Sequence, residues 1–147
     1  MTKLPSKLIV VRIFALILLV LLSACTSIGP GPSRSLVEEA LRMQLSQTQA
    51  QLVPQLQLSA VPDLEVTRLT ISAEKPMLIE DLQGFKVEGF YDLVVKLPKQ
   101  AIKQNHKFFE LYVQRQKRAQ TWRLARPVKE AGESTNKWAT YAISNLR

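Results

Sequence analysis

The chain has 147 residues, of which 46% are hydrophobic and 22% charged, and its 20 Lys and Arg outnumber its 12 Asp and Glu. This length accommodates one ordinary domain, and the apolar fraction is too high for a chain that is disordered throughout. A single Cys excludes an intramolecular disulfide and a single His excludes a multi-histidine metal site, so we expect neither metal nor cofactor.

Residues 1–24 have the pattern of an export signal. Three bases, Lys3, Lys7 and Arg12, precede ten consecutive apolar residues at positions 13–22. A basic segment, a short apolar segment and small residues before a cleavage point are typical of a secretory signal peptide. The apolar stretch is shorter than the roughly 20 residues of a membrane-spanning helix. An uncleaved N-terminal anchor is the alternative interpretation.

The next residues, Leu22-Ser23-Ala24-Cys25, resemble the lipobox of bacterial lipoproteins, in which an apolar residue and two small residues precede a Cys. The thiolate of Cys25 is nucleophilic enough to accept a diacylglyceryl group as a thioether, whereas the alternative is a buried structural Cys. The resemblance implies cleavage before Cys25, acylation of its new amino group with a fatty acid such as palmitate, and attachment to a membrane through this covalent lipid. Because residue 26 is Thr and not Asp, it also implies the outer membrane where the source has one, and otherwise the outer face of the cell membrane.

Removal of the signal peptide changes the meaning of the positive charge. Residues 1–24 contain three bases and no acid, so the formal net charge falls from +8 to +5 in residues 25–147. An exported protein meets no cellular DNA, and a moderate basic excess is a generic feature. We therefore expect no nucleic-acid partner.

The mature chain begins with a short linker. Residues 25–33 comprise the acylated Cys and a segment rich in Gly, Pro and Ser. These residue types do not propagate a helix, so we interpret the segment as a flexible tether. We assign residues 34–147 to a single domain.

The domain is expected to open with an amphipathic helix. Ser35 and Glu38 have the spacing of a capping box, with Ser35 as the N-cap. An apolar stripe then runs at helical spacing from Val37 to Leu52, opposite a face rich in Gln. Pro54 should end or kink this helix directly before it.

Beyond the helix the hydrophobic period changes to two, which predicts strands. The alternation slips between Val66 and Leu69, as is typical of a β-bulge, and Glu80-Asp81 predicts a turn. The short polar connection 117–120 predicts an antiparallel hairpin between the runs that flank it. The predicted strands are 64–71, 85–97, 107–116, 121–128 and 137–143.

These elements predict an α+β fold in which one amphipathic N-terminal helix packs on a four- to five-stranded antiparallel sheet. Their order resembles cystatin-like and nuclear-transport-factor-like folds, in which a curved sheet wraps a helix. The sequence Trp122-Arg123-Leu124, at the end of a late strand, is similar to those families too. A small outer-membrane assembly lipoprotein with helices on a three-stranded sheet is a comparable resemblance.

Catalytic patterns are absent from the sequence. His106 lies among Lys residues and its nearest acid in sequence is Glu110, so we interpret it as a solvated loop residue and not as a general base. The sequence has no phosphate-binding Gly-rich loop, zinc-ligand spacing or nucleophile elbow. We therefore predict a protein that is not an enzyme.

The positive charge is concentrated in one part of the chain. Residues 25–95 carry a net charge of −4, whereas residues 96–129 carry ten bases and one acid. We call residues 107–128 the basic hairpin and expect it to dock on an acidic protein partner or on anionic lipid headgroups, which attract each base by about 1 kcal/mol. The alternative is a solvated edge whose charges prevent unwanted strand pairing. The candidate partner-binding residues are Lys107, Arg115, Lys117, Arg118, Arg123 and Arg126.

A curved sheet around a helix also leaves room for an apolar pocket. Phe90 and Val94, on the more polar face of strand 85–97, either line such a pocket or pack under the segment around Trp138. The leading prediction is a lipid-anchored exported binding or assembly module that docks a partner through the basic hairpin. The alternative is a carrier of a small apolar ligand in a pocket between helix and sheet.

Overall fold

The computed structural model of the chain describes residues 6–22, 29–57, 59–118, 121–129 and 137–143. Its contacts divide the chain into two units, Met1–Pro30 and Gly31–Arg147. The first unit contains helix α1 (Ser6–Leu22), in which large apolar side chains between Ile9 and Ile17, such as Phe14, are exposed. Among the described residues, none of the helices has the length and apolar character needed to cross a membrane.

The second unit begins with helix α2 (Arg34–Gln55), which starts earlier than predicted. Its N-cap is Ser33, which has an extended backbone and whose Oγ accepts a hydrogen bond from the Leu36 backbone N–H at 3.3 Å. The predicted capping box on Ser35 is therefore wrong, because the chain already turns into the helix two residues before it. Glu38 instead forms an ion pair with Arg42 at 2.7 Å, one turn further along.

The end of α2 also differs slightly from the prediction. Pro54 lies inside the helix, which continues to Gln55, and the backbone N–H of Leu56 donates to the Leu52 carbonyl at 2.9 Å. A proline near a helix end removes one backbone hydrogen bond from a turn that is already close to fraying. The helix therefore continues through Pro54 for one more residue.

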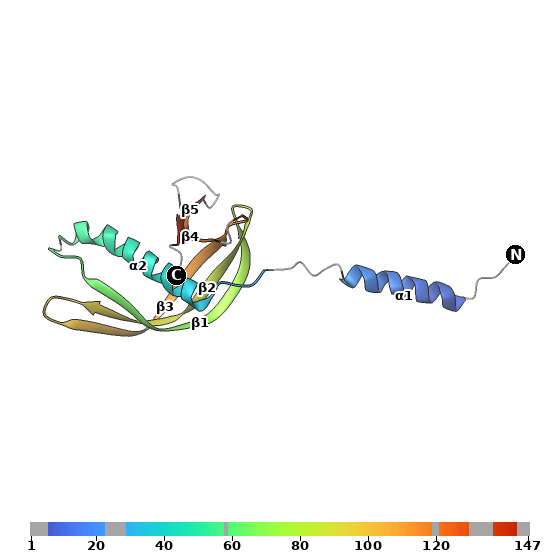
Figure 1. Cartoon of the computed structure of the whole chain (residues 1–147), viewed down its shortest axis with the longest axis horizontal. Helices are drawn as coiled ribbons and strands as arrows, with labels where there is room; N and C mark the ends of the chain where they lie inside the picture. Colours follow the sequence, from blue (N-terminus) through green and yellow to red (C-terminus); the bar gives the residue numbers. More distant parts are fainter. Residues whose placement is uncertain (1–5, 23–28, 58, 119–120, 130–136, 144–147) are drawn as a thin grey trace. The chain divides into compact units, whose positions relative to one another are not determined.

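Five antiparallel strands form an open sheet in the order β1-β2-β3-β4-β5, so each strand pairs with its neighbour in sequence (Figure 1). The α+β class and the upper end of the expected strand number are thus confirmed, although the described part of the chain contains two helices. The strands are β1 (Asp63–Ile79), β2 (Leu82–Lys96), β3 (Ala101–Arg115), β4 (Trp122–Val128) and β5 (Lys137–Ala142).

Strand β1 is longer than predicted because it continues through Pro76 to Ile79. Proline is tolerated there since β1 lies at an edge of the sheet, where one side of the backbone needs no partner. The predicted slip is confirmed, because the pairing of β1 with β2 shifts between Thr67 and Thr70. The predicted turn is confirmed too: Glu80 and Asp81 have φ angles of 49° and 64°, as a two-residue hairpin requires.

Strand β3 begins at Ala101, six residues before the predicted start, and His106 therefore lies in a strand and not in a loop. The backbone of His106 has a φ of 53°, and the pairing of β2 with β3 shifts at this point. This bulge interrupts the alternation that sequence analysis uses to find strands. The hairpin of β3 and β4 is confirmed by the pairing of Arg115 with Trp122, and β5 is confirmed as the last strand.

The core lies between one face of this sheet and the first half of α2. Leu36, Val37, Ala40 and Leu41 are the buried residues of the helix. They form one cluster with side chains of the sheet, in particular Phe85, Val87, Leu111, Val113 and Leu124. The alternation predicted for β2 is confirmed, because the residues from Phe85 to Leu93 at every second position are buried.

Candidate functional site

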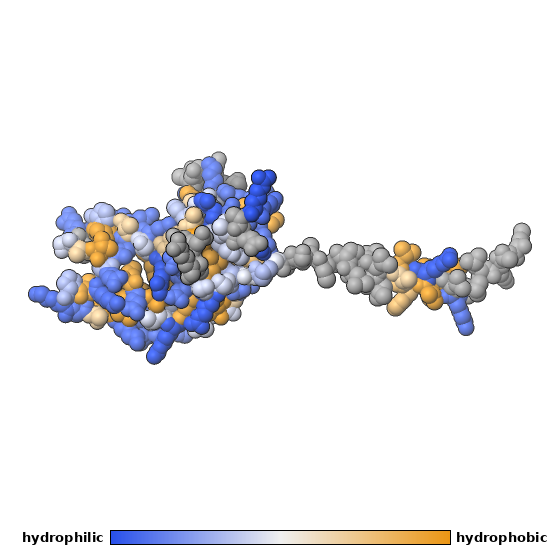
Figure 2. Space-filling model, viewed as in Figure 1, coloured by the Kyte–Doolittle hydropathy of each residue, from blue (hydrophilic) through white to orange (hydrophobic). Residues whose placement is uncertain are grey.

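The second half of α2 is not covered by the sheet in the way the first half is. The same apolar stripe that is buried at Val37 and Leu41 continues to Leu52, whose side chain is 44% exposed, and Leu56 beyond it is 61% exposed. Figure 2 shows apolar side chains at the free end of the helix and between it and the strands. The apolar stripe of the helix is therefore buried in its first half and exposed to solvent at its C-terminal end.

This open part of the stripe forms one wall of a hollow of about 250 Å³, which we call the apolar groove. The other wall comes from the residues just before and at the start of β1. Among the described residues, its lining consists of two polar side chains, Thr48 and Gln49, and six apolar ones: Leu45, Leu52, Val53, Leu56, Pro62 and Leu64.

Leu64, at the start of β1, is the sheet residue that lines the groove, and it lies at the ends of three neighbouring strands. The register places Leu64, Val95 and Ile102 next to one another on β1, β2 and β3, and Val66 next to Leu93. We call this part of the sheet, residues 63–67, 93–96 and 101–104, the sheet arm. Its apolar residues continue the core surface, so the arm extends the apolar face toward the exposed half of α2.

A second hollow, of about 230 Å³, adjoins the apolar groove and is more polar. We call it the polar hollow; Arg42, Ser46 and Gln49 line it from α2, and Asp63 lines it from β1. The two hollows share the side chains of Leu45, Gln49, Pro62 and Leu64. They therefore adjoin one another along these four side chains, with the apolar groove on one side and the polar hollow on the other.

The charged groups around the polar hollow form solvent-exposed ion pairs. Arg42 contacts Glu38 at 2.7 Å, and Lys96 contacts Glu65 at 2.8 Å and Asp63 at 3.9 Å. The hydrogen bond from Lys96 holds the pKa of Glu65 below its ordinary value. Between these pairs, the Gln49 side chain donates to the Pro62 carbonyl at 2.6 Å and links α2 to the segment before β1.

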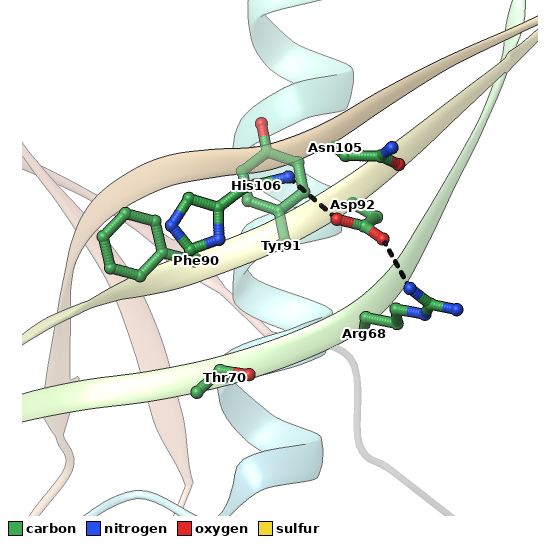
Figure 3. Close-up of a pocket in the computed structure, with 7 residues that line it drawn as sticks. All are labelled: Arg68, Thr70, Phe90, Tyr91, Asp92, Asn105 and His106. Atoms are coloured by element: carbon green, nitrogen blue, oxygen red, sulfur yellow. Dashed lines mark hydrogen bonds and ion pairs between the residues drawn. The ribbon is translucent and has the colours of Figure 1, made fainter.

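The sheet bends where the arm begins, and Asp92 holds the bend together (Figure 3). Arg68 on β1 and His106 on β3 both have positive φ angles, of 49° and 53°, on either side of Asp92 in β2. The Asp92 side chain is almost fully buried; its Oδ1 accepts a hydrogen bond from the His106 backbone N–H at 2.8 Å, and its Oδ2 lies 3.8 Å from Arg68 Nη1. One carboxylate thus contacts both bulged strands.

A hollow of about 370 Å³ opens beside this carboxylate, lined by residues that include Arg68, Thr70, Asn105 and His106. The imidazole of His106 stacks on the Phe90 ring, with centroids 4.2 Å apart. Asp92 therefore bonds to the backbone of His106 and not to its ring, as Figure 3 shows. A carboxylate that orients an imidazole for proton transfer would have to contact a ring nitrogen, so this pair is structural.

The candidate residues of the basic hairpin are not gathered on one surface. Lys117 and Arg118 are exposed in the turn between β3 and β4. Lys107 donates a hydrogen bond to the Gln104 side chain at 2.8 Å, well away from that turn along β3. Arg115 lies with its guanidinium carbon 6.0 Å from the centre of the Trp122 ring, at the limit of a cation–π contact.

The two arginines of β4 point to opposite faces of the sheet. Arg123 donates to the side chain and the carbonyl of Thr140 on β5, both at 3.0 Å. Arg126 donates to the Gln47 side chain of α2 at 3.3 Å, on the face where Leu124 enters the core. Both arginines thus connect elements within the domain. A count of charges along the sequence does not reveal such contacts.

The two side chains proposed for a helix–sheet pocket lie elsewhere. Phe90 stands on the opposite face of β2 from the core, where it contacts His106 and Phe108. Val94 is not among the residues that line the apolar groove, and Trp138 packs against Tyr112 with centroids 5.1 Å apart. Phe90 lines the hollow beside Asp92 instead, because the best alternating strand faces the helix with its other side.

Cys25 and the small residues before it lie outside the described residues. Comparison of the chain with family models, curated proteins and solved structures finds no match. The apolar groove had a signal in the sequence, since the apolar stripe of α2 continues past its buried first half as far as Leu52.

Proposed function

We propose that the mature chain is a lipid-anchored protein of the cell envelope that binds an acyl chain in the apolar groove. The lipobox Leu22-Ser23-Ala24-Cys25 supports the anchor. The anchor would keep the domain at a bilayer surface, where acyl chains are the most abundant apolar ligands. This proposal replaces the basic hairpin with the groove as the leading binding site.

One observation carries the choice of ligand: Leu52 of α2 and Leu56 directly after it stay open to solvent inside a hollow with a mainly aliphatic lining. Contiguous exposed apolar surface on a soluble domain marks an interaction site. The volume of about 250 Å³ lies just below the range of drug-sized ligand pockets, as suits a site that holds one segment of an acyl chain. The lining residues named above include no aromatic ring, which favours a flexible aliphatic chain over a planar ligand.

The test is photocrosslinking with a lipid that carries a diazirine at the end of one acyl chain. The full-length chain is reconstituted into vesicles that contain a trace of this lipid, and the crosslinked residues are located by mass spectrometry after trypsin digestion. The chain has no Lys or Arg between Arg42 and Arg68, so most of the groove lies in one peptide, residues 43–68. We expect the crosslinks to concentrate in that peptide.

Two matched variants distinguish the groove from chance contact with the bilayer. Leu56→Gln changes a leucine of the groove, and Leu78→Gln changes a leucine of β1 with a similar exposure, 70% against 61%. Loss of a leucine contact should lower the crosslink yield in peptide 43–68 by about threefold to tenfold. Leu78→Gln should leave it unchanged. Crosslinks spread evenly along the chain, or equal yields for both variants, would contradict the proposal.

A second candidate function is docking of an acidic protein or of anionic headgroups at the turn of the basic hairpin. The exposure of Lys117 and Arg118 supports it. This candidate site contains fewer residues than the sequence predicted, because Arg123 and Arg126 form hydrogen bonds within the domain.

A further inference from the structure

We propose that the ligand of the apolar groove is a zwitterionic phospholipid, held by one acyl chain, whose headgroup lies in the polar hollow between Arg42 and Asp63. This inference rests on the proposed acyl-chain binding and adds the class of lipid. It starts from the adjacency of the two hollows, which share four lining residues. A ligand that fills both must have an apolar part and a polar part.

The charges of the polar hollow select the headgroup. Its lining contains one cation, Arg42, and one anion, Asp63, and the neutral hydrogen-bonding side chains of Ser46 and Gln49. A purely anionic headgroup would be repelled by the carboxylate of Asp63. An uncharged headgroup would form no ion pair with either Arg42 or Asp63. A phosphate joined to an ammonium group complements both residues, since a guanidinium binds a phosphate with two parallel hydrogen bonds.

Both charged side chains are accessible to such a ligand. The Arg42 side chain is 50% exposed and its partner Glu38 lies one turn away on the same helix. The Asp63 side chain is 75% exposed and lies 3.9 Å from Lys96. This is a long contact, because Lys96 pairs more closely with Glu65, at 2.8 Å. Exposed ion pairs of this kind contribute little to stability. A headgroup can therefore replace them at small cost.

The arrangement along α2 fits the length of one lipid chain. Arg42 and Leu56 are fourteen positions apart, which corresponds to about 21 Å along a helix axis. The polar end lies near the middle of the helix and the apolar end at its C-terminus. The volume of the apolar groove corresponds to about eight groups of the size of a water molecule, which is room for part of one acyl chain.

The test uses three single-chain probes with the same photoactivatable chain: lysophosphatidylcholine, lysophosphatidylglycerol and a monoacylglycerol. The full-length chain is exchanged from detergent into a non-ionic amphipol, so that no other phospholipid competes. We expect lysophosphatidylcholine to crosslink to the groove peptide at about tenfold lower concentration than the monoacylglycerol, because a charged hydrogen bond is gained at the headgroup. Lysophosphatidylglycerol should lie between the two.

Charge-removing variants locate the headgroup. Arg42→Gln should remove the advantage of both phospholipids over the monoacylglycerol, with the crosslinks then found in the longer peptide 35–68. Asp63→Asn should bring lysophosphatidylglycerol level with lysophosphatidylcholine. Arg34→Gln, at the other end of α2, is the matched control and should change neither preference.

The possible outcomes separate this inference from the proposed function. If the three probes crosslink to the groove equally and Leu56→Gln still lowers the yield, acyl-chain binding stands and the headgroup inference is overturned. If none of the probes crosslinks to residues 43–68, the proposed function itself fails. A preference for lysophosphatidylcholine that survives both Arg42→Gln and Asp63→Asn also overturns the headgroup inference.

Discussion

The buried carboxylate of Asp92 accepts a hydrogen bond from the backbone N–H of His106 at 2.8 Å, and this contact spans the point where the sheet bends. A bulge frees a backbone N–H from its strand partner, and a buried N–H without an acceptor is costly. Asp92 supplies that acceptor and also approaches Arg68 on the opposite strand. The sheet arm beyond the bend carries Leu64, which lines the apolar groove, so Asp92 is a positioning residue for the groove.

Replacement of Asp92 should therefore affect both stability and binding. Asp92→Leu leaves the His106 N–H unsatisfied and should lower the free energy of unfolding by about 1–3 kcal/mol. Asp92→Asn retains an oxygen acceptor and should cost less. Urea unfolding measures the first effect and photocrosslinking to peptide 43–68 measures the second. Equal stability of the two variants would contradict the role of this hydrogen bond.

Gly89 is a position on β2 where a side chain cannot be accommodated. A Cβ there would collide with the carbonyl oxygen of Thr70 and lie 2.8 Å from the Phe109 ring, and neither group is the end of a flexible chain. Gly89→Ala should destabilise the domain by about 1–3 kcal/mol, because the packed strands must move apart. Gly31→Ala is the control, since its Cβ meets the flexible carboxylate of Glu74. Thermal unfolding should show a clear loss for the first variant alone.

Much of the fold follows from the sequence because it depends on local patterns. The turn at Glu80-Asp81, the slip after Val66 and the buried face of β2 each arise from a few neighbouring residues. The early start of β3 was missed because the bulge at His106 depends on Asp92, which is 14 positions away in sequence. The roles of Arg123 and Arg126 were missed for the same reason. A charge count cannot show that a cation already has a partner on another element.

The outer face of the sheet carries a polar network that should make stability depend on pH. Lys86 contacts Glu88 at 2.8 Å and Glu110 at 3.0 Å, and the hydroxyl of Tyr112 donates to Glu110 at 2.6 Å. The hydrogen bond from Lys86 lowers the pKa of Glu88, and those from Tyr112 and Lys86 lower the pKa of Glu110.

A carboxylate whose pKa is lower in the folded chain stabilises it above the unfolded pKa of about 4.3, and this contribution disappears as the pH falls through the folded value. We therefore expect the urea midpoint to be constant between about pH 7 and 5 and to fall below about pH 4. Glu110→Gln should flatten the acid limb, whereas Glu39→Gln on α2 should not. Unfolding curves at several pH values test this, and an identical acid limb in Glu110→Gln would exclude the network as its cause.

The basic hairpin can be dissected into docking and structural residues. Lys117→Glu with Arg118→Glu reverses two exposed charges in the turn and should leave the unfolding temperature nearly unchanged. If the turn docks an acidic partner, this variant should lose that partner in affinity purification from solubilised membranes. Arg123→Ala should instead lower stability by about 1–2 kcal/mol, since it removes the bonds that hold Thr140 of β5. Unchanged co-purification in the charge-reversed variant would argue against docking.

The anchor is tested at Cys25, which should be the acceptor of the lipid. Serine has nearly the same size but lacks a thiolate, so Cys25→Ser should abolish incorporation of a labelled fatty acid and leave the precursor with residues 1–24 attached. Thr26→Ser, which retains the motif Leu22-Ser23-Ala24-Cys25, should be labelled and processed normally. Gel mobility and mass spectrometry distinguish the precursor from the mature form. A Cys25→Ser protein that is still cleaved after Ala24 and released without lipid would show that residues 1–24 are an ordinary signal peptide. The acyl chain bound in the groove would then be reached from solution and not from a bilayer to which the domain is tethered.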